Sequence, residues 1–204
     1  MKLAACIVET RPFPDLIKII NGHMKHLPAS TKLFIFHGDT NNYLRAMFPE
    51  AEFHHLAGPM TLHRYNTLLT STDFWTNFLD YDKVLIFQYD SMILRPGIEE
   101  FYEWDYIGAP WKWQQIGGNG GISLRTPKIM YDIAKDYGMP QGWNEDVHIC
   151  RIMSEYGIGK LAPREECLKF GTEAVFALNT FCYHAIDQWL TVEQCKQIKN
   201  QLII

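Results

Sequence analysis

The chain has 204 residues, of which 47% are hydrophobic and 21% charged, a composition that predicts a globular protein with one sizeable core. Its formal net charge of -4 provides no basic field, which disfavours nucleic-acid binding. The five cysteines are odd in number and lack Cys-x-x-Cys spacing, so we expect neither a disulfide framework nor a zinc knuckle, and we expect a reducing compartment. The first apolar run is too short for a signal peptide, and no run is long enough for a membrane span. These features predict a cytoplasmic protein.

The first part of the chain alternates between strand and helix patterns. Continuous apolar runs predict buried strands over residues 3–8 and 32–36, with a third strand around residues 53–56. Between them, Asp15 is expected to cap a helix with apolar residues at helical spacing, and a short helix is expected over residues 43–47. This β-α-β-α-β order predicts a parallel sheet with right-handed crossovers.

The apolar run at residues 84–87 predicts a central strand, preceded by a long helix over residues 61–79. Gln88, Asp90 and Ser91 follow the strand directly. Ligands of open α/β sheets bind at the carboxyl ends of strands, so we expect the site to form around Asp90. The alternative is a turn residue, because Asp often hydrogen-bonds its own backbone where strands end.

The second half of the chain continues the mixed pattern. Strands are expected over residues 106–109 and 121–124, and helices over residues 126–137 and 144–156. Gly138 and Gly157 are expected to end the two helices. A last helix is expected to open at Thr191, with Gln194 completing a capping box. Its pattern reaches Ile204 without a stop signal, which suggests the hypothesis that further domains follow in a longer chain.

Glu145 and Asp146 follow Asn144 at the predicted start of a helix. Asn is a preferred N-cap residue, and the helix dipole stabilises acids in the first turn, so one interpretation is purely structural. The same environment favours ionised carboxylates, and either acid could then accept a proton from a sugar hydroxyl as a general base. Both interpretations stay open at this point.

Other residues also allow two interpretations. The segment GGNGG at residues 117–121 is either a flexible turn or a place where a ligand approaches the backbone, and it matches neither a P-loop nor a dinucleotide fingerprint. His184, after a predicted late strand, is either a hydrogen-bonded structural residue or a metal ligand. Trp111, Trp113 and Trp143 could form a wall for a sugar ring or pack in the core. Arg11 and Arg64 could meet a diphosphate or be solvated.

Five motifs, in order from about Arg64 to Asp146 and with a weaker tail through His184, resemble those of the GT-A type nucleotide-sugar glycosyltransferases, and more closely those of a small glycosyltransferase-like family. They are RYNTLLTSTDFW, VLIFQYDS, DYIGAPW, GNGGISLR and NEDVH. The resemblance implies a GT-A (Rossmann-like) α/β fold, with a mixed, mainly parallel sheet flanked by helices in a single domain over residues 1–204. It further implies a donor half over about residues 1–100 and an acceptor half over about residues 101–204.

The resemblance also implies the substrates and the metal. The donor is expected to be a nucleotide diphosphate sugar, with a UDP-sugar favoured, and the acceptor a carbohydrate or another hydroxyl compound. Asp90 matches the final acid of the D-x-D motif that holds a divalent metal in such enzymes. Gln88 stands in place of the first acid, so weaker metal binding or a ribose contact is expected. His184 matches a late metal ligand, which favours Mn²⁺, with Mg²⁺ as the alternative.

The resemblance therefore implies a metal-dependent hexosyltransferase that inverts, with Asp146 as the base and Glu145 orienting the acceptor; a retaining route stays open. The expected donor-binding residues are Thr10, Arg11, Arg64, Gln88, Asp90, Asn119, Gly120 and Gly121, the acceptor-binding residues are Trp111 and Trp143, and the metal ligands are Asp90 and His184. Two alternatives remain. One is a catalytically inactive sugar-nucleotide-binding or interaction module, suggested by the missing first acid, and the other is a metal-dependent phosphoesterase using Asp90.

Overall fold

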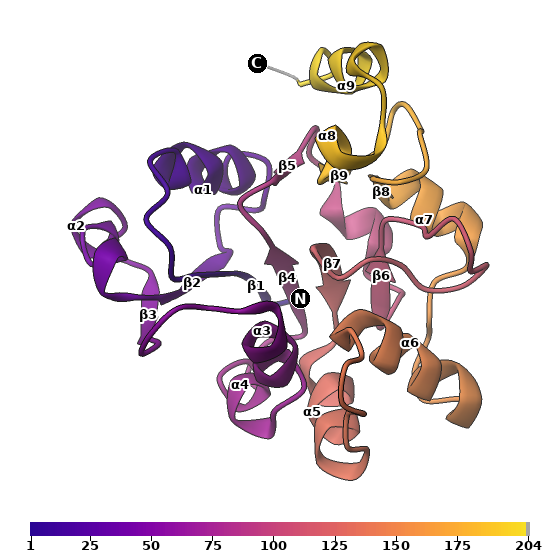
Figure 1. Ribbon diagram of the computed structural model, residues 1–204, viewed down its shortest axis with the longest axis horizontal. Helices are drawn as coiled ribbons and strands as arrows, with labels where there is room; N and C mark the ends of the chain where they lie inside the picture. The colour runs from indigo at the N-terminus through magenta and orange to yellow at the C-terminus, as the bar shows by residue number, and fades with distance from the viewer. Residues whose placement is uncertain (203–204) are drawn as a thin grey trace.

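A six-stranded, mainly parallel sheet forms the centre of the molecule (Figure 1). The computed structural model describes residues 1–202. The strands in spatial order are β3 (Glu52–His55), β2 (Lys32–His37), β1 (Leu3–Glu9), β4 (Lys83–Phe87), β7 (Ile122–Arg125) and β6 (Tyr106–Gly108). The first four are parallel, whereas β7 is antiparallel to both β4 and β6. The predicted α/β fold class is therefore confirmed.

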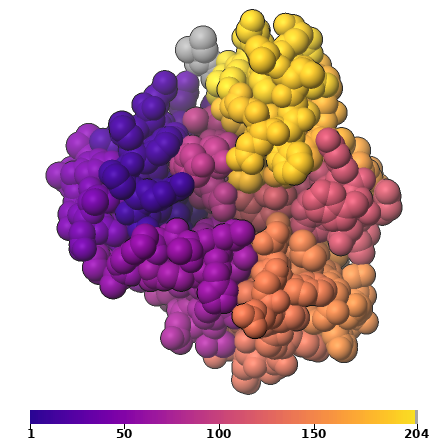
Figure 2. Space-filling view, in the orientation of Figure 1, coloured from indigo at the N-terminus to yellow at the C-terminus, as the bar shows by residue number. Residues whose placement is uncertain are grey.

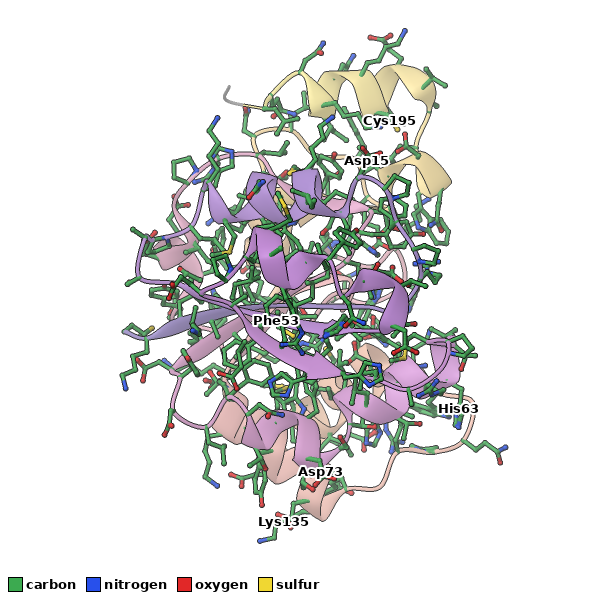
Figure 3. All side chains as sticks on the ribbon, turned by 90° about the vertical axis from the view of Figure 1, so that its left-hand side faces the viewer. Asp15, Phe53, His63, Asp73, Lys135 and Cys195 are labelled. Carbon is green, nitrogen blue, oxygen red and sulfur yellow. The ribbon has the colours of Figure 1, made fainter. Side chains whose placement is uncertain are left out.

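Strands β1 and β4 are buried over their whole lengths, because helices cover both faces of the sheet. Helix α1 (Leu16–Met24) lies on one face, and α3 (Leu62–Leu69), α4 (Thr72–Thr76) and α5 (Pro127–Asp136) lie on the other (Figure 1). Figure 3 shows the same layers edge-on, with Asp15 above the sheet, Phe53 on edge strand β3, and Asp73 and Lys135 below. Burial on both faces explains why these two strands are continuous apolar runs without alternation.

A second, three-stranded sheet was not predicted. It contains β5 (Ser91–Ile93), β9 (Cys182–His184) and β8 (Gly171–Thr172), in the order β5-β9-β8. β5 continues directly from the turn after β4, and it pairs antiparallel with β9 so that Ser91 lies opposite His184. This sheet therefore brings the late histidine to the carboxyl end of the central strand.

Most predicted helices are confirmed. They are α1, α2 (Leu44–Met47), α5 (Pro127–Asp136), α6 (Glu145–Tyr156) and α9 (Val192–Lys199). Gly157 ends α6 in the left-handed conformation, with φ 65°, and Thr191 and Gln194 form the predicted capping box of α9. Asp15 and Asn144 occupy N-cap positions without a capping side-chain bond. Helix α9 ends at Lys199, and Ile204 lies outside the described residues.

The predicted long helix over residues 61–79 is instead two helices, α3 (Leu62–Leu69) and α4 (Thr72–Thr76). Ser71 causes the break, because its hydroxyl donates to the Leu68 carbonyl at 2.7 Å and accepts from the Phe74 N–H at 3.3 Å. The buried Trp75 indole N–H donates to the freed Leu69 carbonyl at 2.8 Å. The apolar spacing continues across the break, which is why the sequence pattern did not reveal it.

Two short helices complete the fold, α7 (Arg164–Phe170) and α8 (Ile186–Trp189), together with 3-10 turns over Asp39–Asn41 and Ile98–Phe101. All five cysteines are buried and unpaired, as their number and spacing predicted. Within residues 1–202, no helix has the length and apolar character needed to cross a membrane.

Candidate active site

A cavity of about 340 Å³ opens at the carboxyl end of β4. Residues from both halves of the chain line it, including Leu62 on α3, Asp90, Gly120, Asp146 and Trp189 on α8. In Figure 2 the purple α3 segment, the orange start of α6 and the yellow carboxy-terminal segment meet near the middle of the visible face. A second cavity of about 220 Å³ adjoins it, and the two cavities share Leu62, Tyr65, Gln88 and Tyr89 in their linings. This placement agrees with the rule that open α/β sheets bind ligands at strand ends.

Asp90, Gln88 and His184 converge in the first cavity. His184 Nε2 lies 3.3 Å from Asp90 Oδ1 and 3.1 Å from Gln88 Oε1. The Ala185 N–H donates to the Asp90 carbonyl at 3.0 Å, so the backbone after β9 is tied to the turn after β4. The structure thus brings His184 to Gln88 and Asp90, which lie nearly a hundred positions earlier in the chain.

Glu173 is a member of this group that the sequence did not single out. Its Oε1 lies 3.3 Å from His184 Nδ1, and its side chain is buried. Burial opposes a charge on the imidazole, but the neighbouring Asp90 and Glu173 carboxylates outweigh it and raise the pKa of His184 to about 9. No local sequence pattern marked it, because β8, which it follows directly, has only two residues and forms by pairing with β9.

Asp90 and His184 could contribute two ligands to a divalent metal. Asp90 Oδ1 is buried and has no well-aligned hydrogen bond within residues 1–202. It lies 3.3 Å from His184 Nε2, so the two atoms are near enough to bind one ion. Over the same residues, no group of three or more His, Cys, Asp or Glu side chains is arranged to hold an ion. A metal here would need further oxygen ligands from a substrate, as ions bound with diphosphates commonly do.

Asp146 faces the same cavity from the first turn of α6. Its Oδ2 accepts from the Gly120 N–H at 2.9 Å, and its Oδ1 accepts from the Val147 N–H at 2.7 Å. Burial, with a smaller contribution from the Glu145 charge, raises the pKa of Asp146 to about 6, against the opposing effect of the two N–H groups. Asp146 is therefore a carboxylate at neutral pH that is more basic than an ordinary aspartate.

Glu145 also lines the cavity, but its carboxylate is paired with an arginine. Its two carboxylate oxygens accept from Arg125 Nη1 and Nη2 at 2.8 and 2.9 Å, and both side chains are buried. The Arg125 guanidinium also lies over the Tyr106 ring, 4.9 Å from its centroid. Glu145 is thus engaged by Arg125, which favours a positioning role over the expected contact with the acceptor.

The glycine segment lies where expected, with Asn119, Gly120 and Gly121 lining the cavity. Its glycines are required by the protein's own side chains. A Cβ at Gly121 would overlap the His184 ring, and one at Gly120 would overlap Glu145. Asn119 Oδ1 accepts from the Gly121 N–H at 2.7 Å and closes the turn.

Of the other expected donor residues, only Arg11 lines either of these two cavities. It lies in the second one, where its guanidinium is over the Tyr89 ring at 4.6 Å and pairs with Glu9 at 2.7 Å. Thr10 is buried, and its hydroxyl accepts from the Met60 N–H at 2.8 Å. Arg64 lies outside both cavities. Its guanidinium donates to the carbonyls of Ala57 and Pro59, which fixes the loop before α3.

The expected acceptor tryptophans do not line the cavity either. Trp111 is buried and stacks on Trp113, and the Trp143 ring lies under the Arg151 guanidinium at 4.8 Å. The tryptophan at the cavity is Trp189, five residues after His184. Its nearness to His184 in the sequence was the available signal.

Comparison with known proteins agrees with this architecture. The apo-form glycosyltransferase GlyE of Streptococcus pneumoniae TIGR4 has a similar structure, with a TM-score of 0.55 at 13% identity. The similarity covers 100% of this chain and 61% of that chain, so this chain spans less than two thirds of GlyE's length. It confirms the expected glycosyltransferase-like fold. No curated protein matches the chain.

The sequence itself matches one family model. The model is described as "Protein of unknown function (DUF5672)", and the match covers residues 50–185, more than half of the chain. The matched region includes the Asp90 turn, the glycine segment, the start of α6 and His184. The chain therefore belongs to the DUF5672 family.

Proposed function

We propose that the protein is a glycosyltransferase that moves a sugar from a nucleotide diphosphate sugar, with a UDP-sugar favoured, to a hydroxyl group of an acceptor. One observation carries the proposal: the Asp90–His184 pair and the Asp146 carboxylate line a single cavity at the carboxyl end of β4. A glycosyltransferase must neutralise charge on the leaving diphosphate and deprotonate the attacking hydroxyl. Both groups must therefore lie within reach of one anomeric carbon. The glycosyltransferase-like fold supports the proposal.

The two adjoining cavities suggest how the donor lies. The second cavity, at the carboxyl end of β1, is lined by Glu9, Arg11 and Tyr89, and we assign it to the nucleoside. Gln88 lines both cavities, which suits a contact with the ribose between the base and the diphosphate. The geometry of Thr10 and Arg64 supports structural roles for these two residues.

Asp90 and His184 would hold the metal, with Mn²⁺ favoured and Mg²⁺ as the alternative. When bound, the metal neutralises charge on the departing diphosphate. His184 must give up its Nε2 proton to become a ligand. Glu173, next to Nδ1, keeps the other ring proton in place and fixes the orientation of the imidazole.

Asp146 would act as the base. As the acceptor oxygen forms its bond to the anomeric carbon, the hydroxyl proton passes to an Asp146 oxygen, and the diphosphate leaves with the electrons of the broken C–O bond. Attack opposite the leaving group inverts the anomeric centre. A pKa of about 6 suits this role, because the carboxylate is ionised at neutral pH and still basic. The Arg125–Glu145 pair would hold the start of α6 in position.

Thermal stabilisation by nucleotide diphosphates tests the donor site. A ligand that binds only the folded protein raises the melting temperature. We expect one of UDP, GDP, ADP, CDP and dTDP to stabilise the protein in the presence of Mn²⁺, and the effect to vanish in Asp90→Ala. Asp187→Ala is the matched control, because Asp187 is exposed and pairs with Lys199 outside the cavity. If no nucleotide stabilises the wild-type protein, the proposal is wrong.

Analysis of the reaction products then distinguishes a transferase from an inactive binding module and from a phosphoesterase. The transferase should hydrolyse its sugar nucleotide slowly in the presence of Mn²⁺ and transfer the sugar when an acceptor is present. Nucleotide binding without either reaction would indicate an inactive sugar-nucleotide-binding module. Release of inorganic phosphate from simple phosphate esters would instead indicate a phosphoesterase.

A further inference from the structure

Trp189 is a large aromatic side chain left open at the rim of the cavity. It is 47% exposed and lines the first cavity but not the second. Trp189 is not among the residues that the two cavities share, and the nucleoside is assigned to the second cavity. Asp146, His184 and Asp90 likewise line the first cavity but not the second.

Ala185, four residues before Trp189, has a strained backbone conformation that the surrounding structure holds in place. Ala185 adopts the left-handed conformation, with φ 47° and ψ 27°, which is unfavourable for a residue other than glycine. Such strain persists where the surrounding structure imposes it, and it is concentrated at ligand sites. Here the Ala185 N–H donates to the Asp90 carbonyl at 3.0 Å, so the start of α8 is held at the end of β4.

Two further contacts hold helix α8 and Trp189 in place. Ile186 is buried in a small apolar cluster with Leu94, Cys195 and Ile198, which joins α8 to α9. On the other side, Lys112 Nζ lies 5.9 Å from the centroid of the Trp189 ring, a cation–π contact between the indole and the segment after β6. The indole is therefore exposed on a rigid support, as a binding platform requires.

The chemistry of the rim indicates the ligand class. An indole ring offers a flat apolar face, and the exposed Gln188 amide beside it offers both a hydrogen-bond donor and an acceptor. A pyranose has the complementary surface, with a face of C–H groups and hydroxyls around its edge. A nucleobase would also stack on an indole, but the nucleoside is assigned to the other cavity.

We propose that Trp189 and Gln188 form the acceptor subsite and that the acceptor is a carbohydrate whose pyranose ring stacks on Trp189. The inference rests on the proposed glycosyl transfer and adds the chemical class of the acceptor. The stacked sugar would present a hydroxyl to Asp146 from the side opposite the leaving diphosphate. The base and the platform lie on separate elements, α6 and α8, that line one cavity.

Saturation-transfer NMR tests this subsite directly. The probes are methyl α- and β-pyranosides of glucose, galactose, mannose and N-acetylglucosamine, together with lactose, maltose and cellobiose. We expect at least one probe to bind the wild-type protein and Trp189→Ala to weaken its binding about tenfold, the loss of one aromatic stacking contact. Trp189→Phe should retain most of the binding. Trp113→Ala is the matched control, because Trp113 is 63% exposed but does not line the cavity, and it should bind as the wild type does.

Two results would overturn the inference: no probe binds the wild-type protein, or Trp189→Ala binds as well as the wild type. Thermal stabilisation of the wild-type protein by nucleotide diphosphates tests the transferase proposal independently of the acceptor subsite. If a nucleotide diphosphate stabilises the protein but Trp189 is not required for sugar binding, only the acceptor subsite is wrong. If sugar binding requires Trp189 but no nucleotide stabilises the protein, the carbohydrate subsite stands and the transferase proposal fails.

Discussion

Arg125 and Glu145 form a doubly hydrogen-bonded ion pair in which the two side chains are 0% and 3% exposed. The pair joins the end of β7 to the first turn of α6, directly beside Asp146. Arg125 Nη2 also lies 3.4 Å from the Gly120 carbonyl, and the Gly120 N–H donates to Asp146. One buried network therefore connects the sheet, the glycine segment and the proposed base.

Glu145→Gln should destabilise the protein strongly. The substitution keeps the shape of the side chain but leaves the Arg125 charge buried without a counter-charge, which typically lowers the free energy of unfolding by about 3–5 kcal/mol. Chemical denaturation measures the change. The control is Glu155→Gln, which removes an exposed i,i+4 pair with Arg151 and should cost about 0.5 kcal/mol or less. Equal effects of the two substitutions would contradict a structural role for the buried pair.

Asp146→Asn should abolish transfer without unfolding the protein. Loss of a general base lowers the rate by about 10²–10⁴-fold. In the wild-type protein, kcat/KM should fall as the pH drops below about 6, because Asp146 then gains a proton. Steady-state rates measured from about pH 5 to 8 at constant ionic strength give this decrease in kcat/KM. A rate that stays constant down to pH 5 would assign the base elsewhere.

The same carboxyl group links stability to pH. Its pKa rises on folding from an ordinary 3.8 to about 6, mainly through burial, while the nearby Glu145 raises it and Arg125 lowers it. The folded protein therefore holds a proton between these values that the unfolded chain lacks. The stability from that proton is complete below about pH 4 and is lost as the pH rises through 6, a change of about 3 kcal/mol. Denaturation at several pH values should show this change in the wild-type protein but not in Asp146→Asn.

The elements that the sequence predicted correctly carry their signals locally. β4 is a run of apolar residues buried on both faces, α6 ends at a left-handed glycine, and α9 begins with a capping box. In contrast, β5 has three residues and forms because it pairs with β9, which lies far along the chain. β8 has only two residues, too few for a recognisable pattern, and pairs with the same strand. No local pattern can specify strands that depend on a distant partner.

The residues of the candidate site likewise fall into those that the local sequence predicted and those that it did not. Asp90, His184 and Asp146 were predicted from a strand end, a late strand and a helix start, and they line one cavity. The cavity tryptophan was missed because Trp111 and Trp189 have the same side-chain chemistry, and the tertiary fold determines which of them is buried and which lines the cavity. Glu173 was missed because its partner is the imidazole of His184 on a neighbouring strand.

Gln88→Glu should strengthen metal binding. The substitution adds a carboxylate of the same length next to His184 Nε2, where the Gln88 amide oxygen now lies at 3.1 Å. Affinity for hard cations rises with the number of ligand charges, so the Mn²⁺ concentration that gives half-maximal thermal stabilisation should fall about tenfold. Gln188→Glu adds the same charge at the cavity rim and should have a much smaller effect. Similar shifts in both variants would mean that Gln88 does not lie beside the ion.

Gly121→Ala should disrupt the metal site through His184. A Cβ at this position overlaps the imidazole ring, which is buried and held between Asp90 and Glu173, so the ring must move. We expect Mn²⁺-dependent stabilisation to be lost and the free energy of unfolding to fall by about 1–3 kcal/mol, as for other overpacked sites. Gly138→Ala is the matched control, because a Cβ there meets no atom within 4 Å, and its backbone is not left-handed. That variant should keep the wild-type Mn²⁺ response and gain up to about 1 kcal/mol of stability by reducing the entropy of the unfolded chain. If Gly121→Ala responds to Mn²⁺ as the wild type does, the imidazole that it displaces is not a ligand, and Asp90 would have to bind the metal with substrate oxygens alone.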